Sequence, residues 1–232
     1  MNIINNSFFK RVYQKIFGIP YIVSYAQTGE DILIDFIRGA KKLKDFTYLD
    51  IGANNPVKIN NTYMFYEKGF KGVCIEPDPA VYAVLKKKRP NDTCLNIGIA
   101  SKASSEADFY VMNHPGLNTF SKEEAETLVN NGQGKIMQVI KVPLITVEEV
   151  IDKHFNGKAP VFVNIDVEGL DEEILSSFPF HKYKPSIFCI ETVEYTDDAS
   201  SEKRQGIFDV MKQNGYKPFA DTYINTIFIS NI

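Results

Sequence analysis

Tyr48-Leu49-Asp50-Ile51-Gly52-Ala53-Asn54 and Cys74-Ile75-Glu76-Pro77 are the two stretches that predict the fold. Each is typical of a short apolar strand that ends in an acidic or glycine-containing turn. An acid at the tip of the second strand, roughly twenty residues after the glycine turn, suits a ribose because its vicinal hydroxyls can donate to one carboxylate. The pair therefore predicts an adenosine-containing cofactor across the top of a doubly wound sheet.

The glycine turn, residues 50–56, narrows the class of cofactor. A dinucleotide site needs several glycines so that the pyrophosphate can approach the backbone and a helix N-terminus. This turn has a single glycine, Gly52, and Pro56 stands where a helix would already be running. No Walker lysine follows, which argues against a nucleoside triphosphate. S-adenosylmethionine lacks phosphate and carries positive groups that favour carboxylates such as Asp50, so we expect it as the cofactor.

Strand and helix patterns alternate along the chain. We expect strands at 46–51, 71–76, 93–97, 161–166 and 186–191, and helices within 24–38 and at 79–88, 146–154, 170–177 and 201–214. This alternation predicts an α/β, Rossmann-like fold with a doubly wound, mostly parallel sheet. Residues 216–219 and 226–230 are expected to pair as a hairpin-like edge. Less regular strands at 107–112 and 135–142 enclose a polar, mobile segment, so 107–142 is expected to be an insert on the substrate side.

Composition indicates one domain spanning 1–232. A chain of 232 residues with 44% hydrophobic content can form a full core, and a net charge of −3 argues against a nucleic-acid binder. The three cysteines have no C-x-x-C spacing, so we expect free thiols in a reducing compartment, which would be the cytoplasm. No run of about 18 apolar residues predicts a membrane span, and residues 1–20 lack the apolar core of a signal peptide.

Residues 1–38 are expected to form an N-terminal helical cap. Apolar residues recur at helical spacing from Phe8 to Phe17, with basic residues between them. A helix covering the domain is one interpretation, and a homodimer contact or attachment to a membrane surface is the other.

A set of short motifs follows one another along the chain: Tyr25-Ala26-Gln27-Thr28-Gly29-Glu30-Asp31, Leu49-Asp50-Ile51-Gly52-Ala53-Asn54-Asn55-Pro56, Asn61-Thr62, Phe65-Tyr66-Glu67-Lys68-Gly69-Phe70-Lys71-Gly72, Ile75-Glu76-Pro77-Asp78-Pro79, Arg89-Pro90, Asn96-Ile97-Gly98, Ile165-Asp166-Val167-Glu168-Gly169 and Ile190-Glu191. With these motifs in this order, the chain resembles the FkbM-type methyltransferases from residue 24 to 192. The chain departs from the usual pattern at Ala26, Thr28, Asn60 and Phe70. These changes leave the cofactor motifs intact but could alter the substrate.

The resemblance implies a class I-like fold, S-adenosylmethionine as methyl donor and O-methylation, often of sugars or polyketide-derived hydroxyls. It also implies that Gln27, Glu30 and Thr62 lie near the methionine end of the cofactor. For Gln27 and Glu30 a role at the start of a helix is the alternative, because Thr28 is followed three residues on by Asp31.

The remaining cofactor roles follow from the strand ends, which meet at one edge of a parallel sheet. Glu76 would hold the ribose hydroxyls, Gly52 and Ala53 would allow close backbone approach, and Asp50 would face the methionine end. The full predicted set is Gln27, Glu30, Asp50, Gly52, Ala53, Asn54, Thr62, Glu76, Pro77, Asn96, Ile97 and Asp166, with Asn96 and Ile97 beside the adenine.

The candidate catalytic residues are Asp166, Glu168 and His114. Asp166 and Glu168 bracket one residue, so in an extended chain their side chains point the same way. With Glu191 they could bind Mg²⁺ or Mn²⁺, which would lower the pKa of a substrate hydroxyl; the alternative is that Glu168 caps the following helix. His114 lies in the insert and competes as general base, while a surface loop histidine is its plainer interpretation.

We expect an O-methyltransferase that acts on a sugar hydroxyl, on a sugar nucleotide or a bacterial surface glycan, with the insert around 114–121 choosing the acceptor. The bias toward Asn, Lys and Ile indicates an AT-rich, bacterial genome. Two alternatives stay open: an NAD-dependent oxidoreductase, which would need a phosphate cradle that this sequence lacks, and a non-catalytic glycan-binding or assembly subunit that keeps the fold.

Overall fold

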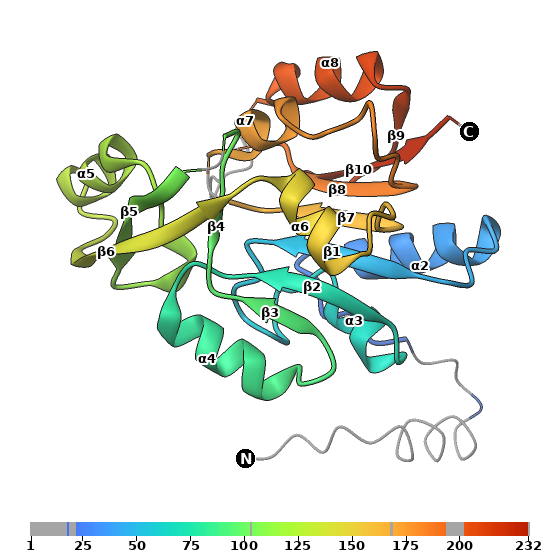
Figure 1. The fold of residues 1–232 in the computed structure, drawn as a ribbon, viewed down its shortest axis with the longest axis horizontal. Coiled ribbons are helices and arrows are strands. Elements are labelled where there is room, and N and C mark those ends of the chain that lie inside the picture. The colour runs from blue at the N-terminus through green and yellow to red at the C-terminus, as the bar shows by residue number, and fades with distance from the viewer. Residues whose placement is uncertain (1–17, 19–21, 103, 168, 194–201, 232) are drawn as a thin grey trace.

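The central element of the fold is a seven-stranded sheet (Figure 1). The computed structural model describes residues 18, 22–102, 104–167, 169–193 and 202–231. The strands lie in the order β3-β2-β1-β7-β8-β10-β9, with β3 at Thr93–Leu95, β2 at Lys71–Ile75, β1 at Thr47–Ile51, β7 at Phe162–Ile165, β8 at Ile187–Glu191, β10 at Asn225–Ser230 and β9 at Tyr216–Asp221. The first five in this order are parallel, and β10 is antiparallel to both neighbours. The predicted fold class and the terminal strand pair are confirmed.

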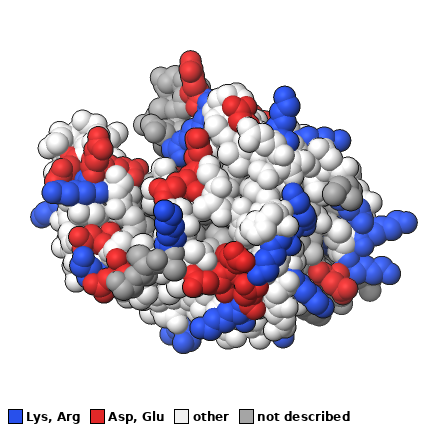
Figure 2. Space-filling view, turned by 45° about the horizontal axis from the view of Figure 1, so that its top comes forward, with Lys and Arg blue, Asp and Glu red and all other residues white. Residues whose placement is uncertain are grey.

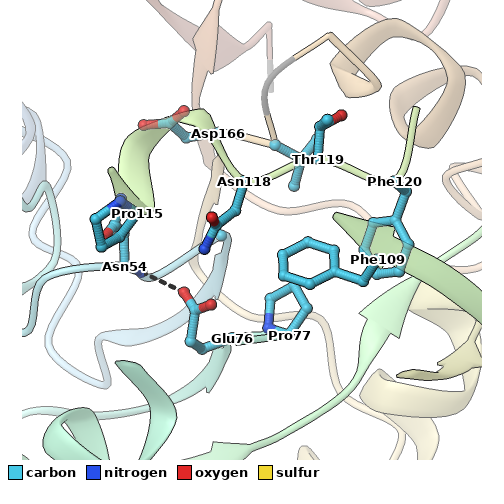
Figure 3. A pocket seen from close by; sticks show the side chains of 11 residues that line it. Asn54, Glu76, Pro77, Phe109, Pro115, Asn118, Thr119, Phe120 and Asp166 are labelled. Carbon is cyan, nitrogen blue, oxygen red and sulfur yellow. Dashed lines mark hydrogen bonds between the residues drawn. The ribbon is translucent and has the colours of Figure 1, made fainter. Parts of the chain in front are cut away.

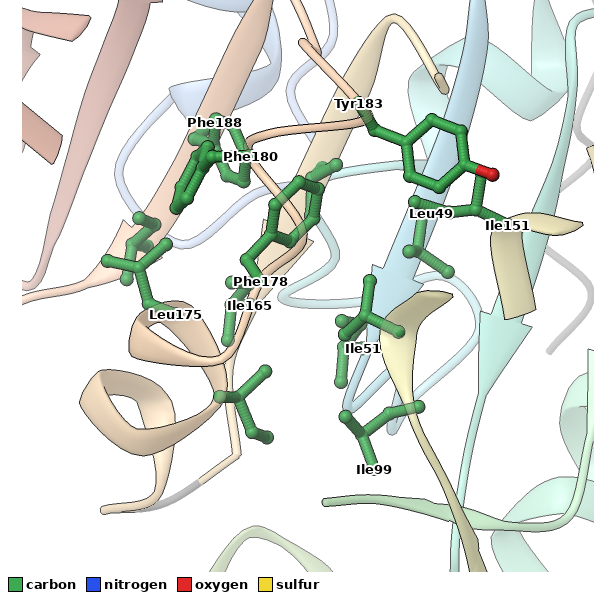
Figure 4. Close-up of a cluster of buried hydrophobic side chains, with 14 of the residues drawn as sticks. Leu49, Ile51, Ile99, Ile151, Ile165, Leu175, Phe178, Phe180, Tyr183 and Phe188 are labelled. Atoms are coloured by element: carbon green, nitrogen blue, oxygen red, sulfur yellow. The ribbon is translucent and has the colours of Figure 1, made fainter. Parts of the chain in front are cut away.

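Successive side chains of the parallel strands point to opposite faces of the sheet. Each face therefore has its own hydrophobic cluster, which is covered by a layer of helices. Leu49 and Ile51 of β1 face a cluster formed with α6 (Val147–His154), α7 (Asp171–Ser176) and α8 (Gln205–Gln213). Tyr48, one position away, faces the cluster of α2 (Glu30–Ala40), α3 (Tyr63–Glu67) and α4 (Pro79–Lys88). Figure 4 shows the first of these clusters between the sheet and its helices. Because successive side chains point to opposite faces, Asp50 must also face the second layer.

Local signals explain where the well-predicted helices begin. The side chain of Asp78 accepts from the backbone N–H groups of Ala80 and Val81, and Pro79 occupies the first helical position of α4. Thr146 and Glu149 form a capping box at α6. α2 begins after Gly29, which lies in the left-handed region at φ 94° and offers no side-chain cap. The capping role considered for Thr28 is therefore not observed.

The insert forms a second, three-stranded sheet at the left of Figure 1. Its order is β4-β6-β5, with β4 at Gly98–Ile99, β6 at Ile136–Ile145 and β5 at Ser104–Met112. The short 3-10 helix η1 (Pro115–Leu117) and α5 (Lys122–Asn130) connect β5 to β6. The sequence predicted no helix between the two insert strands, whereas the structure has α5 there; its one fully buried residue, Ala125, gives too little apolar periodicity to reveal a helix. That this segment is mobile stays a prediction.

The remaining expectations concern the N-terminus. Within the predicted cap 1–38, α2 accounts for the helix expected within 24–38, whereas 1–17 and 19–21 lie outside the described residues, and with them the predicted dimer or membrane-surface contact. Among the residues that the structure describes, no helix combines the length and the apolar character needed to cross a bilayer.

Candidate active site

A pocket opens at the carboxyl ends of β1, β2 and β7 (Figure 3). Its sheet side is lined by Gly52, Asn54, Glu76, Pro77, Asp166 and Val167. Its other side comes from the insert, through Phe109, Pro115, Asn118, Thr119 and Phe120. The structure therefore brings together five of the predicted cofactor residues, Gly52, Asn54, Glu76, Pro77 and Asp166, at one edge of the sheet.

Glu76 is held by backbone N–H groups at the floor of this pocket. Its Oε2 accepts from the N–H of Asn54 at 2.9 Å, and its Oε1 accepts from the N–H of Asp78 at 2.8 Å. The residue is only 5% exposed, and burial raises the pKa of Glu76 to about 7 although these two hydrogen bonds oppose the shift. Each oxygen has a further lone pair, so the carboxylate can still accept from two hydroxyls that enter the pocket.

The backbone around position 52 leaves no room for a side chain, so this position requires glycine. Its φ is 83°, and a Cβ placed on it would lie 1.7 Å from the carbonyl oxygen of Asp166. The absence of a side chain at Gly52, which was expected to admit a cofactor, also allows the end of β1 to lie close to the end of β7. This contact brings Asp166 to the pocket. Burial, and then repulsion from Asp171 and Asp50, raises the pKa of the Asp166 carboxyl to about 7.

Asp50 does not line the pocket. Its side chain is 1% exposed and accepts from Thr62 Oγ1 at 2.5 Å and from Asn164 Nδ2 at 2.9 Å. The guanidinium of Arg89, fully buried, has Nη1 3.8 Å from Asp50 Oδ2 and donates to Thr62 Oγ1 at 2.9 Å. Burial raises the pKa of Asp50, and Arg89 and the two hydrogen bonds oppose the shift. The sequence marked Arg89 only as part of a family motif and did not single out Asn164, and it predicted neither contact with Asp50, because both residues are distant from Asp50 along the chain.

Asn60 links this buried network to the glycine turn. Its side-chain Nδ2 donates to the carbonyl oxygens of Ala53 and Asn55, at 3.0 and 3.1 Å. Its Oδ1 accepts from the N–H of Thr62 at 3.0 Å and from Arg89 Nη1 at 3.3 Å. Residues 53–55, which flank the Asn54 N–H that binds Glu76, are thereby held by the network around Arg89.

Glu30 and Gln27 lie away from the pocket lining. Glu30 is fully buried and accepts hydrogen bonds from Thr28 Oγ1, Thr222 Oγ1 and Asn225 Nδ2, so it joins α2 to the β9–β10 hairpin. Burial alone would raise the pKa of Glu30, but the hydrogen bonds from Thr28 and Thr222 outweigh it and lower the pKa. Gln27 is exposed. Their roles at the methionine end stay predictions.

The pocket lining does not include Asn96, Ile97 or Ala53, which instead contact residues behind it. Asn96 Nδ2 donates to the carbonyl oxygens of Glu76 and Pro77, both at 2.8 Å, which fixes the turn that carries Glu76. Ile97 packs against the first core cluster, and Ala53 belongs to the second. Contact of Asn96 and Ile97 with an adenine stays a prediction, as does contact of Ala53 with the cofactor.

The insert contributes lining residues that the sequence did not single out. Asn118 Nδ2 donates to Asp78 Oδ2 at 2.9 Å, and Asn118 Oδ1 accepts from the N–H of Met112, so the insert is fastened to the turn after Glu76. The rings of Phe109 and Phe120 lie 4.7 Å apart. Figure 3 shows side chains of the insert coming toward Glu76 and Pro77. No local pattern marks these residues, because their position depends on how two sheets pack.

The catalytic and metal candidates separate in the structure. Asp166 lines the pocket, whereas His114 is exposed just before η1, and its neighbour Pro115 lines the pocket instead. Glu191 lies at the end of β8 and lines a second cavity, and Glu168 is outside the described residues. Among the residues that the structure describes, no three His, Cys, Asp or Glu side chains converge as a metal site. The predicted three-carboxylate metal site therefore gains no support.

Solved structures similar to this chain are methyltransferases, but the likeness is distant. They include a TehB-like SAM-dependent methyltransferase from Corynebacterium glutamicum (10% identity, TM-score 0.44, 96% of each chain covered) and a putative caffeoyl-CoA O-methyltransferase from Staphylococcus aureus (11%, 0.47, 96% of this chain and 91% of that one). A magnesium protoporphyrin IX methyltransferase from Synechocystis shares 8% identity with a TM-score of 0.46, over 97% of this chain and 96% of that one. Identities and TM-scores this low do not indicate which reaction this chain catalyses. No curated protein matches the chain significantly.

A family match carries more weight, because it covers most of the chain. The methyltransferase FkbM domain matches residues 50–218, a range that holds the glycine turn, Glu76, the insert and Asp166. The catalysed reaction is therefore methyl transfer, and the chain belongs to the FkbM methyltransferase family.

Proposed function

We propose that this protein transfers the methyl group of S-adenosylmethionine to a hydroxyl of a sugar, carried on a sugar nucleotide or a bacterial surface glycan. The observation that carries the choice of donor is Glu76, a buried carboxylate that lines the pocket and keeps lone pairs for two hydroxyls. The same turn offers no phosphate cradle, so nothing in the site favours NAD. The three cysteines are free, as in proteins of a reducing compartment, and we place the reaction in the cytoplasm.

Different residues of the pocket would bind the ribose, the nucleoside and the planar base of the donor. Glu76 would accept from the ribose hydroxyls, and the backbone at Gly52 and Asn54 would contact the nucleoside. The aromatic and proline side chains of Phe109, Phe120 and Pro77 offer apolar surface for a planar base. The donor supplies an electrophilic methyl group on a sulfonium, and an acceptor oxygen must be held about 3 Å from that carbon in line with the breaking bond.

Asp166 is the described residue best suited to remove the proton from the acceptor hydroxyl. It lines the pocket, and a pKa of about 7 leaves a large fraction ionised near neutral pH while keeping it basic enough to accept a proton. Glu168 and His114 remain candidates for the same role. The proposal includes no metal, and unchanged turnover after treatment with a chelator is expected; loss of activity restored by Mg²⁺ or Mn²⁺ would reverse this.

The donor is tested by calorimetric titration with S-adenosylhomocysteine and, separately, with NAD. We expect saturable binding of S-adenosylhomocysteine only, and binding of NAD alone would overturn the proposal. The acceptor is tested with radiolabelled S-adenosylmethionine and a panel of sugars and sugar nucleotides. Donor binding without transfer to any acceptor in the panel would favour the non-catalytic glycan-binding subunit.

A further inference from the structure

A second cavity lies beside the cofactor pocket, between the insert and the main body of the molecule. One wall is the face of α5 that carries Glu124, Thr127, Leu128 and Asn131, residues spaced so that they point the same way from a helix. Ala125, on an adjacent face of the helix, is fully buried beside Tyr110 and Met112, and Leu128 packs against the same cluster. The helix that was not predicted from the sequence is therefore anchored through these residues, while Glu124, Thr127 and Asn131 present polar groups to the cavity.

The other wall belongs to the carboxyl edge of the main sheet. Glu191 ends β8, Gly169 follows β7, and Arg204 precedes α8. This is the edge on which Asp166 stands, three residues before Gly169. The cavity and the cofactor pocket thus share the carboxyl edge of the main sheet.

Hydrogen bonds of Thr119 join the linings of the two spaces. Thr119 lines the cofactor pocket and donates through Oγ1 to Glu124 Oε2, 2.6 Å away, which lines the second cavity. The carboxylate of Glu124 also faces the loop after β7, since a Cβ on Gly169 would lie 3.6 Å from its Oε2. Glu124 consequently stands at the boundary between the donor side and the second cavity.

The lining has the chemistry of a saccharide site with a surplus of negative charge. Among the described residues of the lining, three carboxylates, from Glu123, Glu124 and Glu191, accompany one guanidinium, from Arg204, whose Nη1 lies 3.3 Å from Asp171 Oδ2. The lining also has hydroxyl and amide groups of Ser121, Thr127, Asn131 and Gln133 and the apolar side chains of Leu117 and Leu128. Figure 2 shows the insert as a lobe that stands apart from the main body and carries both acidic and basic side chains.

We propose that this cavity binds the methyl acceptor and that the acceptor is an uncharged, hydroxyl-rich saccharide ring. Carboxylates and amides accept and donate to ring hydroxyls, whereas a carboxylate or phosphate on the reacting ring would be repelled by the three glutamates. The inference rests on the proposed function and deepens it, because it names the site and selects neutral sugars among the possible acceptors.

The test uses two glutamates of the same helix. Glu124→Gln removes the charge at the boundary, and Glu126→Gln is the matched control, because Glu126 is 56% exposed in its side chain, pairs with Lys122 on the surface and does not line the cavity. The acceptor probes are methyl glycosides of neutral hexoses and deoxyhexoses, each compared with its uronic acid.

For the full-length protein we expect turnover of neutral probes and little or none of the uronic acids. Glu124→Gln should raise the acceptor KM about tenfold, because one hydrogen bond to a charged group is lost. The variant should also show a smaller preference for neutral over anionic probes. Glu126→Gln should leave both unchanged, and both variants should bind S-adenosylhomocysteine as tightly as the parent.

The outcomes separate the two proposals. Protein that does not bind S-adenosylhomocysteine defeats the proposed function itself. Protein that binds it and methylates anionic probes but no neutral probe overturns the acceptor proposal alone. An equal change of KM in the two variants would also overturn it, because the effect would then not come from the cavity.

Discussion

At the scale of single residues, Glu76 and Asp166 share an unusual property. Both carboxyls line one pocket, and burial raises the pKa of each to about 7. A carboxyl with such a pKa is half protonated near neutral pH, so a modest change in pH alters its hydrogen-bonding role. A ribose needs the ionised form of Glu76, because only that form accepts on both oxygens.

The first prediction concerns the pH dependence of cofactor binding. Affinity for S-adenosylhomocysteine should rise from pH 6 to pH 8, because Glu76 loses its proton as the pH passes about 7. Glu76→Gln should weaken binding by about tenfold or more at pH 8, the cost of losing hydrogen bonds to a charged group. Calorimetric titration at several pH values measures both effects.

The control for this prediction is Asp166→Asn, which removes the other titrating carboxyl of the pocket. It should keep the part of the pH dependence that Glu76 contributes. A Glu76→Gln protein with the parent affinity and the parent pH profile would show that Glu76 does not hold the ribose.

Gly52 supports a second prediction at this scale. Gly52→Ala should destabilise the protein by about 3 kcal/mol or more, because its Cβ would collide with the Asp166 carbonyl oxygen and its φ of 83° disfavours a side chain. Gly39→Ala is the matched control: Gly39 lies in α2 with open space around it, so alanine should stabilise by about 0.5–1 kcal/mol. Urea unfolding measures both, and similar midpoints for the two variants would refute the argument.

At the scale of elements, the glycine turn owes its position to α3 and to the end of α4. Thr62 precedes α3, and Arg89 follows α4. Their contacts with Asp50 and Asn60 bring charged and polar groups from three segments into one buried network. In such a network each partner satisfies another, so the removal of one leaves a buried polar group without its hydrogen bond.

Thr62→Val tests the network with little change of shape. The variant should lose about 1–3 kcal/mol of unfolding free energy, because Asp50 loses a donor and Arg89 an acceptor. It should also bind S-adenosylhomocysteine less tightly, since residues 53–55 depend on the same network. Thr93→Val, at an exposed position of β3, should change neither quantity measurably. Equal stability of the two variants in urea would contradict a structural role for Thr62.

At the scale of the whole molecule, one sheet separates two core clusters and a second sheet attaches the insert to it. The insert has a small core of its own, with three buried residues, Tyr110, Met112 and Ala125. So small a core cannot sustain independent stability, and we expect the insert to unfold with the main body.

The corresponding prediction is a single unfolding transition that the cofactor shifts as a whole. Saturation with S-adenosylhomocysteine at 100 times its dissociation constant should add about 2.7 kcal/mol to the free energy of unfolding. Circular dichroism should give one transition, and hydrogen exchange should report the same opening free energy for β6 as for β1. A separate, earlier opening of β6 that the ligand does not affect would show that the insert is an independent unit.

The sequence predicted the strands of the main sheet and their mostly parallel direction, because these follow from local patterns. Short apolar runs mark β1, β2, β7 and β8, and Pro77, Pro79 and Pro90 delimit α4. The family motifs likewise lie in continuous segments, and Gly52, Asn54, Glu76, Pro77 and Asp166 all occur at strand ends. Local signals suffice wherever a position is set by its near neighbours in the chain.

Only the tertiary structure decided what each strand-end acid faces. Asp50 contacts Arg89 and Asn164 inside the second core layer. Glu76 lines the cofactor pocket, and Glu191 lines the second cavity beside α5. These surroundings come from residues far away in the chain, so no window of sequence contains them. The physical reason is that the environment of a carboxylate is a property of packing, whereas the direction in which its strand runs is a property of the local pattern.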